Sequence, residues 1–192
     1  MAVQGETRER ILRTAAELFR RQGYHGTGLT QVLRESRAPK GSLYFHFPGG
    51  KEQLASEAIA RNGREVGESL AQVLVAARDA RSGVAAMGEH FARSLRESGF
   101  TQGCPLATVA LETAAENETL RAVCDGVYGD WQRGIALALR GWGVPGDRVE
   151  PLAALVLSSL QGAVMLARVR RDVAVIGAVT ARLGDLVEQA AG

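Results

Sequence analysis

The chain has 192 residues, of which 46% are hydrophobic and 23% are charged, and its formal net charge is +2. These values are typical of a globular protein and exclude a disordered or fibrous chain. The first residues, MAVQGETRERIL, carry charges where an export signal needs an apolar run, and the apolar stretch VEPLAALVLSSLQGAVMLARV contains polar residues at helical spacing. We therefore expect a cytoplasmic protein with no membrane span.

Helical periodicity dominates the chain, and its first three predicted helices lie within residues 7–47. We expect them over residues 7–22, from about 28 to 36, and over 40–47. Gly23 is placed to end the first helix, Thr27 to cap the second, and Pro39 to exclude helix at Ala38. A longer helix followed by two short ones, with a turn of roughly four residues between the last two, is typical of a helix-turn-helix unit.

Longer helices follow, with breakers between them. We expect a helix from Lys51 to about Ala77, and others at about 82–98, 105–115, 117–141, 148–167 and 171–190, with Asp147 as an N-cap. The predicted fold class is all-α with about nine helices. The predicted division is a helix-turn-helix domain over residues 1–50 and a second helical domain over 51–192, with 51–77 as the connecting helix.

The charge is distributed unevenly along these elements. Residues 1–64 hold 11 Lys+Arg against 6 Asp+Glu, a balance of +5, whereas residues 65–192 hold 12 against 15, a balance of −3. The only two lysines, Lys40 and Lys51, lie in the basic part. This asymmetry predicts an anionic partner for the N-terminal region, and charge alone leaves nucleic acid and a membrane surface both open.

The stretch APKGSLYFHFPGGKEQL, residues 38–54, concentrates aromatic rings in a helix bounded by helix breakers. Leu43 and Phe47 are four residues apart and are expected to point into the core. The face that remains for the surface carries Lys40, Ser42, Tyr44, Phe45 and His46. In one interpretation these rings pack against the fourth helix. In the other, this face enters the major groove of DNA, where hydroxyls and lysines hold phosphates and side chains reach base edges.

Enzyme motifs are incomplete in this sequence. GTG at 26–28 lacks the third glycine of a dinucleotide fingerprint, and PGGKE lacks the first glycine and the final Ser/Thr of a phosphate-binding loop. The three histidines form no metal-binding pair, and Cys104 and Cys124 are expected to be reduced thiols. We expect no enzyme, no metal and no cofactor. The alternative to a DNA-binding protein is a ligand-binding or structural protein whose basic N-terminal region contacts a partner protein or membrane surface.

The segment GYHGTGLTQVLRESRAPKGSLYFHFPGGKEQL is similar to the DNA-binding region of the TetR family of bacterial transcriptional repressors, over about residues 7–60. TQGCPLATVALE, residues 101–112, together with FPGGKEQL, resembles the branch of the lincomycin-resistance repressors. The resemblance implies a homodimeric repressor whose C-terminal domain binds a small-molecule effector and so releases operator DNA. Two positions depart from the family pattern: Arg37 stands where a turn glycine is usual, and Pro39 where Ser is frequent.

The resemblance also assigns residues. The positions expected at the DNA are Thr27, Thr30, Gln31, Lys40, Gly41, Ser42, Tyr44, Phe45, His46 and Lys51. Those expected at the effector are Met87, Phe91, Leu95, Phe100, Cys104, Leu106, Val127, Tyr128 and Trp131, and the alternative for each is plain core. A mostly apolar set of this kind favours a hydrophobic or aromatic effector. Those expected at the dimer interface are Leu152, Leu155, Ser159, Gly162, Leu166, Ile176, Val179 and Leu183, and the alternative is burial within one chain.

Overall fold

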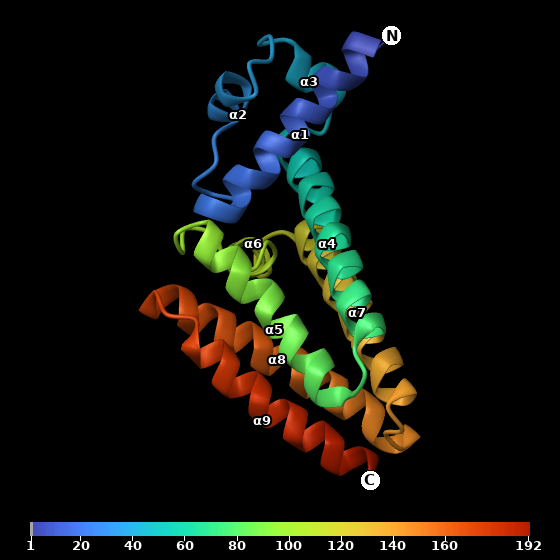
Figure 1. Ribbon diagram of the computed structural model, residues 1–192. Coiled ribbons are helices and arrows are strands. Elements are labelled where there is room, and N and C mark those ends of the chain that lie inside the picture. The colour runs from blue at the N-terminus through green and yellow to red at the C-terminus, as the bar shows by residue number, and fades with distance from the viewer. Residues whose placement is uncertain (1) are drawn as a thin grey trace. The chain divides into compact units, whose positions relative to one another are not determined.

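The computed structural model describes residues 2–192, with side chains from Gly5 onward (Figure 1). Every regular element in that range is a helix, which confirms the all-α prediction. The nine helices are α1 Ala2–Gln22, α2 Leu29–Glu35, α3 Ser42–His46, α4 Gly50–Ala76, α5 Ala80–Glu97, α6 Ala107–Thr113, α7 Glu118–Gly141, α8 Gly146–Arg170 and α9 Ala174–Ala191.

Helix ends follow local chemistry, with one wrong prediction and one cap that was not predicted. Gly23 has a φ of 77° and ends α1, as predicted. The predicted N-cap at Asp147 is wrong: α8 begins at Gly146 with Pro145 as N-cap, which places Asp147 inside the first turn. A cap that the sequence reading missed lies at Asp79, whose carboxylate accepts a hydrogen bond from the backbone N–H of Ser82 at 2.8 Å. The reciprocal bond, in which the backbone N–H of Asp79 donates to Oγ of Ser82 at 3.3 Å, completes a capping box at the start of α5.

The chain folds as two compact units. The first combines the residues up to Arg64 with Pro105–Val127, and the second combines Glu65–Cys104 with Tyr128–Gly192. The first unit extends past the predicted boundary at residue 50 and includes a later segment of the chain. Within the first unit, a Cβ on Gly63 would come within 2.4 Å of Cγ1 of Val127, so α4 and α7 touch where glycine leaves room.

The N-terminal part of the first unit has a core built by α1, α2, α3 and the first half of α4. Two ion pairs, Arg8–Glu57 and Arg61–Glu9, join α1 to α4 at the surface. Fully or almost fully buried apolar side chains fill the space between the helices. They are Ile11, Ala15, Leu18, Phe19, Val32, Leu43, Phe47, Leu54, Ala58 and Ile59. This core fixes which faces of α2 and α3 remain at the surface.

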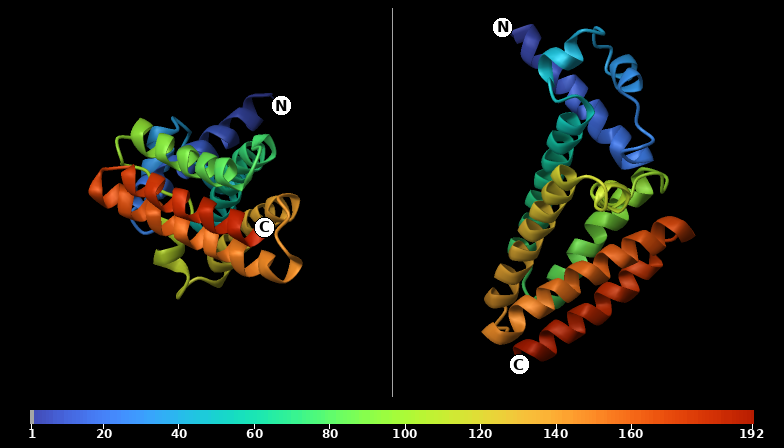
Figure 2. Two further views of the ribbon diagram at one scale, coloured as in Figure 1. Left: turned by 60° about the horizontal axis from the view of Figure 1, so that its bottom comes forward. Right: turned by 180° about the vertical axis from the view of Figure 1, so that it is seen from behind.

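The second unit is organised around α8 and α9, which lie side by side in all views, with α5 packed against α9 (Figure 2). Close packing depends on small residues: a Cβ on Gly88 would meet Thr180 at 2.6 Å, and one on Gly184 would meet the Cα of Arg81 at 3.0 Å. Within the described residues α8 is the one helix long and apolar enough to cross a membrane, by length and composition only. Its buried side chains, which run from Val149 to Ala167, pack it into this unit beside α9, so we interpret it as a core helix.

Candidate nucleic-acid interface

The turn after α2 sets the direction of α3. The N–H of Ala38 donates to the carbonyl of Leu33 at 3.0 Å, and the N–H of Arg37 donates to that of Arg34 at 3.2 Å. This pair of bonds is a Schellman motif, in which the residue after the C-cap is left-handed and most often glycine. Arg37 occupies that position with a φ of 52°.

Helix α3 has two faces of opposite character. Leu43 and Phe47 are completely buried, as predicted, whereas the rings of Tyr44 and Phe45 are 64% and 66% exposed. The alternative in which the α3 rings pack against α4 is therefore wrong for Tyr44 and Phe45. The helix is shorter than the predicted 40–47, because Pro39 to Gly41 form a turn and the N–H of Ser42 donates to the carbonyl of Pro39 at 3.0 Å. A short helix thus presents two large rings to solvent.

Most of the residues expected at the DNA lie at the surface of α2, α3 and their flanks. Those that are exposed are Thr30, Lys40, Gly41, Tyr44 and Phe45. Those that are partly exposed are Gln31, Ser42, His46 and Lys51. The side chain of Gln31 is held in place, since its Oε1 accepts from Gln22 at 2.9 Å and its Nε2 donates to Glu35 at 2.9 Å.

Thr27 is the exception, and both expectations for it are corrected. It is only 1% exposed, and its hydroxyl donates to the carbonyl of Gly23 at 2.7 Å within the turn between α1 and α2. The N-cap of α2 is Gly28, which makes no side-chain capping bond. Thr27 therefore stabilises the turn from inside and has no surface to offer to DNA.

Lys51, at the start of α4, contacts an aromatic ring. Its Nζ lies 4.5 Å from the ring centroid of Tyr24, within the range of a cation–π interaction. Partial burial lowers the pKa of Lys51, and the nearby carboxylate of Glu112 acts in the opposite direction. The ammonium group is thus positioned beside the α1–α2 turn.

The residues expected at the effector fall into both units. Leu106 and Val127 belong to the first unit and the other seven to the second. In the second unit the rings of Phe91 and Tyr128 lie 6.3 Å and 5.7 Å from that of Trp131, between centroids. The Sγ of Cys104 lies 3.9 Å from the hydroxyl oxygen of Tyr128. The structure therefore brings four of the predicted residues together as one cluster of three aromatic rings and a thiol.

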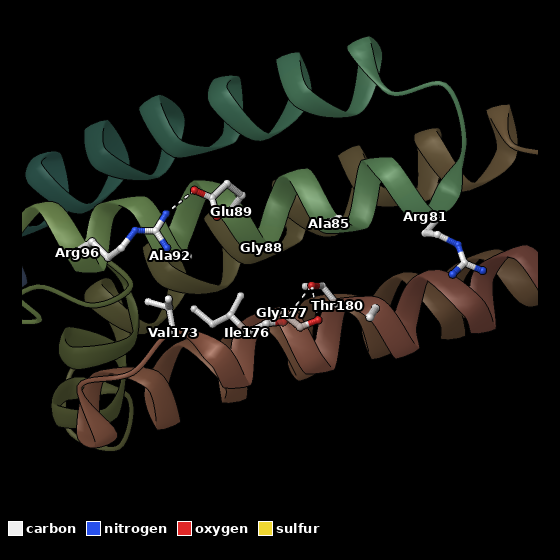
Figure 3. A pocket seen from close by; sticks show the side chains of 11 residues that line it. Arg81, Ala85, Gly88, Glu89, Ala92, Arg96, Val173, Ile176, Gly177 and Thr180 are labelled. Atoms are coloured by element: carbon white, nitrogen blue, oxygen red, sulfur yellow. Dashed lines mark hydrogen bonds and ion pairs between the residues drawn. The ribbon is translucent and has the colours of Figure 1, made fainter.

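Two open grooves lie elsewhere in the second unit. One, of about 470 Å³, runs between α5 and α9, with Ala85, Gly88 and Ala92 facing Ile176 and Thr180 (Figure 3). The arginines at its two ends are ion-paired, Arg81 with Asp185 and Glu188, and Arg96 with Glu89. The other, of about 440 Å³, lies between α4 and α7 and includes Leu74, Leu137 and Trp142. Neither groove is lined by a residue predicted to bind the effector.

The residues expected at the dimer interface divide by burial. Leu152, Ile176 and Leu183 are buried within the chain and belong to its core. Leu155 and Leu166 are 42% and 38% exposed, while the remaining three residues, Ser159, Gly162 and Val179, are partly exposed. Only these five exposed or partly exposed residues can form part of a surface between two chains.

Sequence reasoning missed two polar residues that the structure singles out. Both polar atoms of the Gln161 side chain are buried and make no hydrogen bond within the described chain. Glu112, on α6, accepts a hydrogen bond from the backbone N–H of His25 at 2.9 Å. Neither residue has a local sequence signal, because a glutamine or glutamate within a helix is ordinarily a surface residue.

Family models match both ends of the chain. Residues 11–58 match the bacterial regulatory proteins of the tetR family, and residues 80–182 match the LmrA/YxaF-like C-terminal domain of transcriptional regulators. The HTH-type transcriptional regulator LmrA of Bacillus subtilis is 34% identical over 96% of this chain and 98% of its own. YxaF of the same organism is 37% identical over 90% of both chains. The chain belongs to the TetR family of transcriptional regulators, and its C-terminal half is of the LmrA/YxaF type.

Solved structures agree in fold. A TetR transcriptional regulator from Chloroflexus aurantiacus superposes with a TM-score of 0.84 at 30% identity, over 98% of both chains. A cysteine mutant of the TetR family regulator CifR, solved with a 26-bp operator duplex, has a TM-score of 0.79 at 28% identity, over 91% of this chain and 94% of its own. The helix-turn-helix of this chain is therefore that of a transcriptional regulator.

Proposed function

We propose that this regulator is a cytoplasmic, homodimeric repressor that binds operator DNA through α3 and releases it when a small hydrophobic or aromatic effector binds. The observation that carries the DNA-binding part is the exposed face of α3. Two rings more than 60% exposed, Tyr44 and Phe45, stand beside the lysine and glycine at positions 40 and 41. Apolar rings fit thymine methyl groups in the major groove, and the lysine fits a phosphate.

Gly41 supports a close approach of DNA. Its φ of −76° is ordinary for any residue, and a Cβ there would meet no atom within 4 Å. The fold of the chain therefore gives no reason for a glycine at this position. Absence of a side chain is useful if the backbone of another molecule comes close, as in the approach of a helix end to DNA.

Ser42 has a defined hydrogen-bonding role in the proposal. Its hydroxyl donates to the carbonyl of Pro39 at 2.6 Å, so its proton is already used. The oxygen can still accept, and the amino groups of adenine and cytosine are the donors in the major groove. Ser42 is accordingly proposed to contact a base edge rather than a phosphate.

Dimerisation is proposed to occur through α8 and α9. Leu155, Gly162, Leu166 and Val169 are spaced seven, four and three residues apart and lie on one face of α8, where three of them are large and exposed. A two-fold dimer would present two copies of α3 to half-sites about 34–36 Å apart or a multiple of that spacing. The proposed interface keeps Leu155, Ser159, Gly162, Leu166 and Val179, and leaves out the three buried residues.

The effector is proposed to bind in the second unit at the cluster of Phe91, Tyr128, Trp131 and Cys104. Rings with a hydroxyl, an indole N–H and a thiol suit a planar apolar molecule with few polar groups.

The test is a fluorescence anisotropy titration against the DNA upstream of the protein's own gene, at two salt concentrations, with random duplex as control. We expect saturable binding at one site that weakens steeply with salt, because phosphate contacts release counterions. A panel of hydrophobic aromatic compounds is then added to the complex, and one of them is expected to release the operator. Equal affinity for upstream and random DNA would contradict the repressor proposal. Specific binding that no compound releases would contradict its effector part.

A further inference from the structure

The turn between α1 and α2 is held by a side chain from α6. Oε2 of Glu112 accepts the hydrogen bond from the backbone N–H of His25 at 2.9 Å, across 87 residues of sequence. A Cβ on Gly23 would lie 1.8 Å from Oε1 of the same carboxylate. The carboxylate therefore occupies the space that glycine leaves open, and all three residues belong to the first unit.

A second polar bond ties the same later segment to the start of α4. Nδ2 of Asn117 donates to Oε2 of Glu52 at 2.6 Å. The Oδ1 of Asn117 accepts from the N–H of Leu120 at 2.8 Å, so this side chain also caps the start of α7. Residues 105–127 thus contact the helix-turn-helix region at two places, the α1–α2 turn and the N-terminus of α4.

The α1–α2 turn determines where α2 begins. Inside the turn, Nε2 of Gln22 donates to the carbonyl of Gly26 at 2.6 Å, and the hydroxyl of Thr27 to that of Gly23. The first turn of α2 has no side-chain cap of its own. Its start therefore depends on the turn that precedes it, and Glu112 supplies the contact to that turn from outside.

We propose that Glu112 is a positioning residue for operator recognition, which holds the α1–α2 turn so that α2 and α3 present their surface residues in register with the DNA. This proposal rests on the proposed DNA-binding face of α3. It assigns a role in DNA binding to a residue outside the helix-turn-helix, with no contact to DNA.

The sign of the effect separates positioning from electrostatics. Glu112 is an anion beside a basic DNA-binding region, so loss of its charge alone would strengthen binding to any DNA. Loss of its hydrogen bond would weaken binding to the operator and leave random DNA unaffected. Glu112→Gln removes the charge and keeps an acceptor of the same reach. Glu112→Asp keeps the charge and withdraws the acceptor by one methylene.

The experiment measures the Kd of wild type, E112Q, E112D and E112A for operator and random duplexes at one salt concentration. We expect E112D and E112A to bind the operator about tenfold more weakly, since a hydrogen bond to a charged acceptor is lost, with random DNA bound as well as before or better. We expect E112Q to stay within about twofold of wild type. Glu116→Ala, at an exposed position four residues further along the same segment, is the matched control for charge and is expected to show no operator-specific loss.

Hydrogen exchange supplies a readout that needs no DNA. The amide of His25 is expected to exchange faster in E112D and E112A than in wild type, and at the wild-type rate in E112Q. Operator affinity that follows charge, with E112Q and E112A alike and E112D unchanged, would overturn the proposal. If E112A does not fold, the comparison of E112Q with E112D decides. A wild-type protein that does not prefer the operator over random DNA would overturn the proposed function itself. The His25 exchange rate still tests the Glu112 contact in that case, because it is measured without DNA.

Discussion

Phe45 and Phe47 are two residues apart and have opposite environments: the first ring is 66% exposed and the second is completely buried. The difference follows from helical geometry, because positions two apart lie on nearly opposite faces of a helix. One aromatic residue therefore serves the surface that we assign to DNA, and the other the core that holds this surface in place.

Alanine substitution should separate these two roles. Phe47→Ala is expected to lower the free energy of unfolding by about 3–5 kcal/mol, because it leaves a cavity in the small core. Phe45→Ala is expected to change it by less than about 0.5 kcal/mol, as is usual at the surface. Urea denaturation measures both values. In operator binding, Phe45→Ala should weaken affinity with its fold intact, and a Phe45→Ala variant with wild-type affinity would remove this ring from the interface.

Arg37 offers a stabilising substitution. It adopts a φ of 52° at the end of α2, where an L-residue is disfavoured by about 1–2 kcal/mol relative to glycine. Arg37→Gly should stabilise the protein by about 0.5 kcal/mol after the greater unfolded-chain entropy of glycine is subtracted. Arg34→Gly, inside α2, should instead destabilise it by about 1 kcal/mol. Equilibrium denaturation in urea measures the free energy of unfolding of both variants. A lower value for Arg37→Gly than for wild type would contradict the prediction that Arg37 is strained.

The exposed leucines of α8 should decide the oligomeric state. The double variant with Leu155→Asp and Leu166→Asp is expected to be monomeric at micromolar concentration, because two charges would be buried without partners. Sedimentation velocity measures the mass in solution. Leu111→Asp, at a residue 84% exposed on α6, is the control and should leave the dimer intact. A dimeric double variant would place the interface on another surface.

The capping box at Asp79 should make stability depend on pH. The backbone N–H of Ser82, then its hydroxyl, and then the charges of Arg81 and Arg78 lower the pKa of Asp79 below its ordinary value of 3.8. Because the pKa of Asp79 is lowered in the folded state, its carboxylate stabilises the protein at any pH above the unfolded-state pKa of this group. That contribution is lost as the pH falls through the folded-state pKa. The difference in Tm between wild type and Asp79→Asn should therefore be constant near neutral pH and change below about pH 4. A difference that stays constant down to pH 3 would argue against the shift.

Local chemistry made much of the N-terminal unit predictable. Gly23 and Pro39 mark helix ends through backbone constraints that act within a few residues, and the spacing of Leu43 and Phe47 assigns the two faces of α3. Thr27 was assigned wrongly, because a threonine before a helix has the same pattern whether its hydroxyl caps that helix or bonds backward to Gly23.

Tertiary relationships lay beyond local patterns. The return of residues 105–127 to the N-terminal unit depends on contacts such as Val127 against Gly63, which no periodicity encodes. Burial within one chain and burial between two chains also select the same apolar spacing. Leu152, Ile176 and Leu183 were for this reason placed at the dimer interface, although they belong to the protomer core.

The distribution of lysine governs how this protein can be attached to a sensor. Its only side-chain amines are Lys40, which is exposed beside α3, and Lys51, which is partly covered by Tyr24. Reagents that acylate lysine would therefore anchor or label the molecule on the face assigned to DNA, whereas thiol reagents would meet only the buried Cys104 and Cys124. Protein coupled to a sensor surface through its lysines would stay folded but could not bind DNA. In solution, protection of the same two amines from acylation would report that DNA is bound.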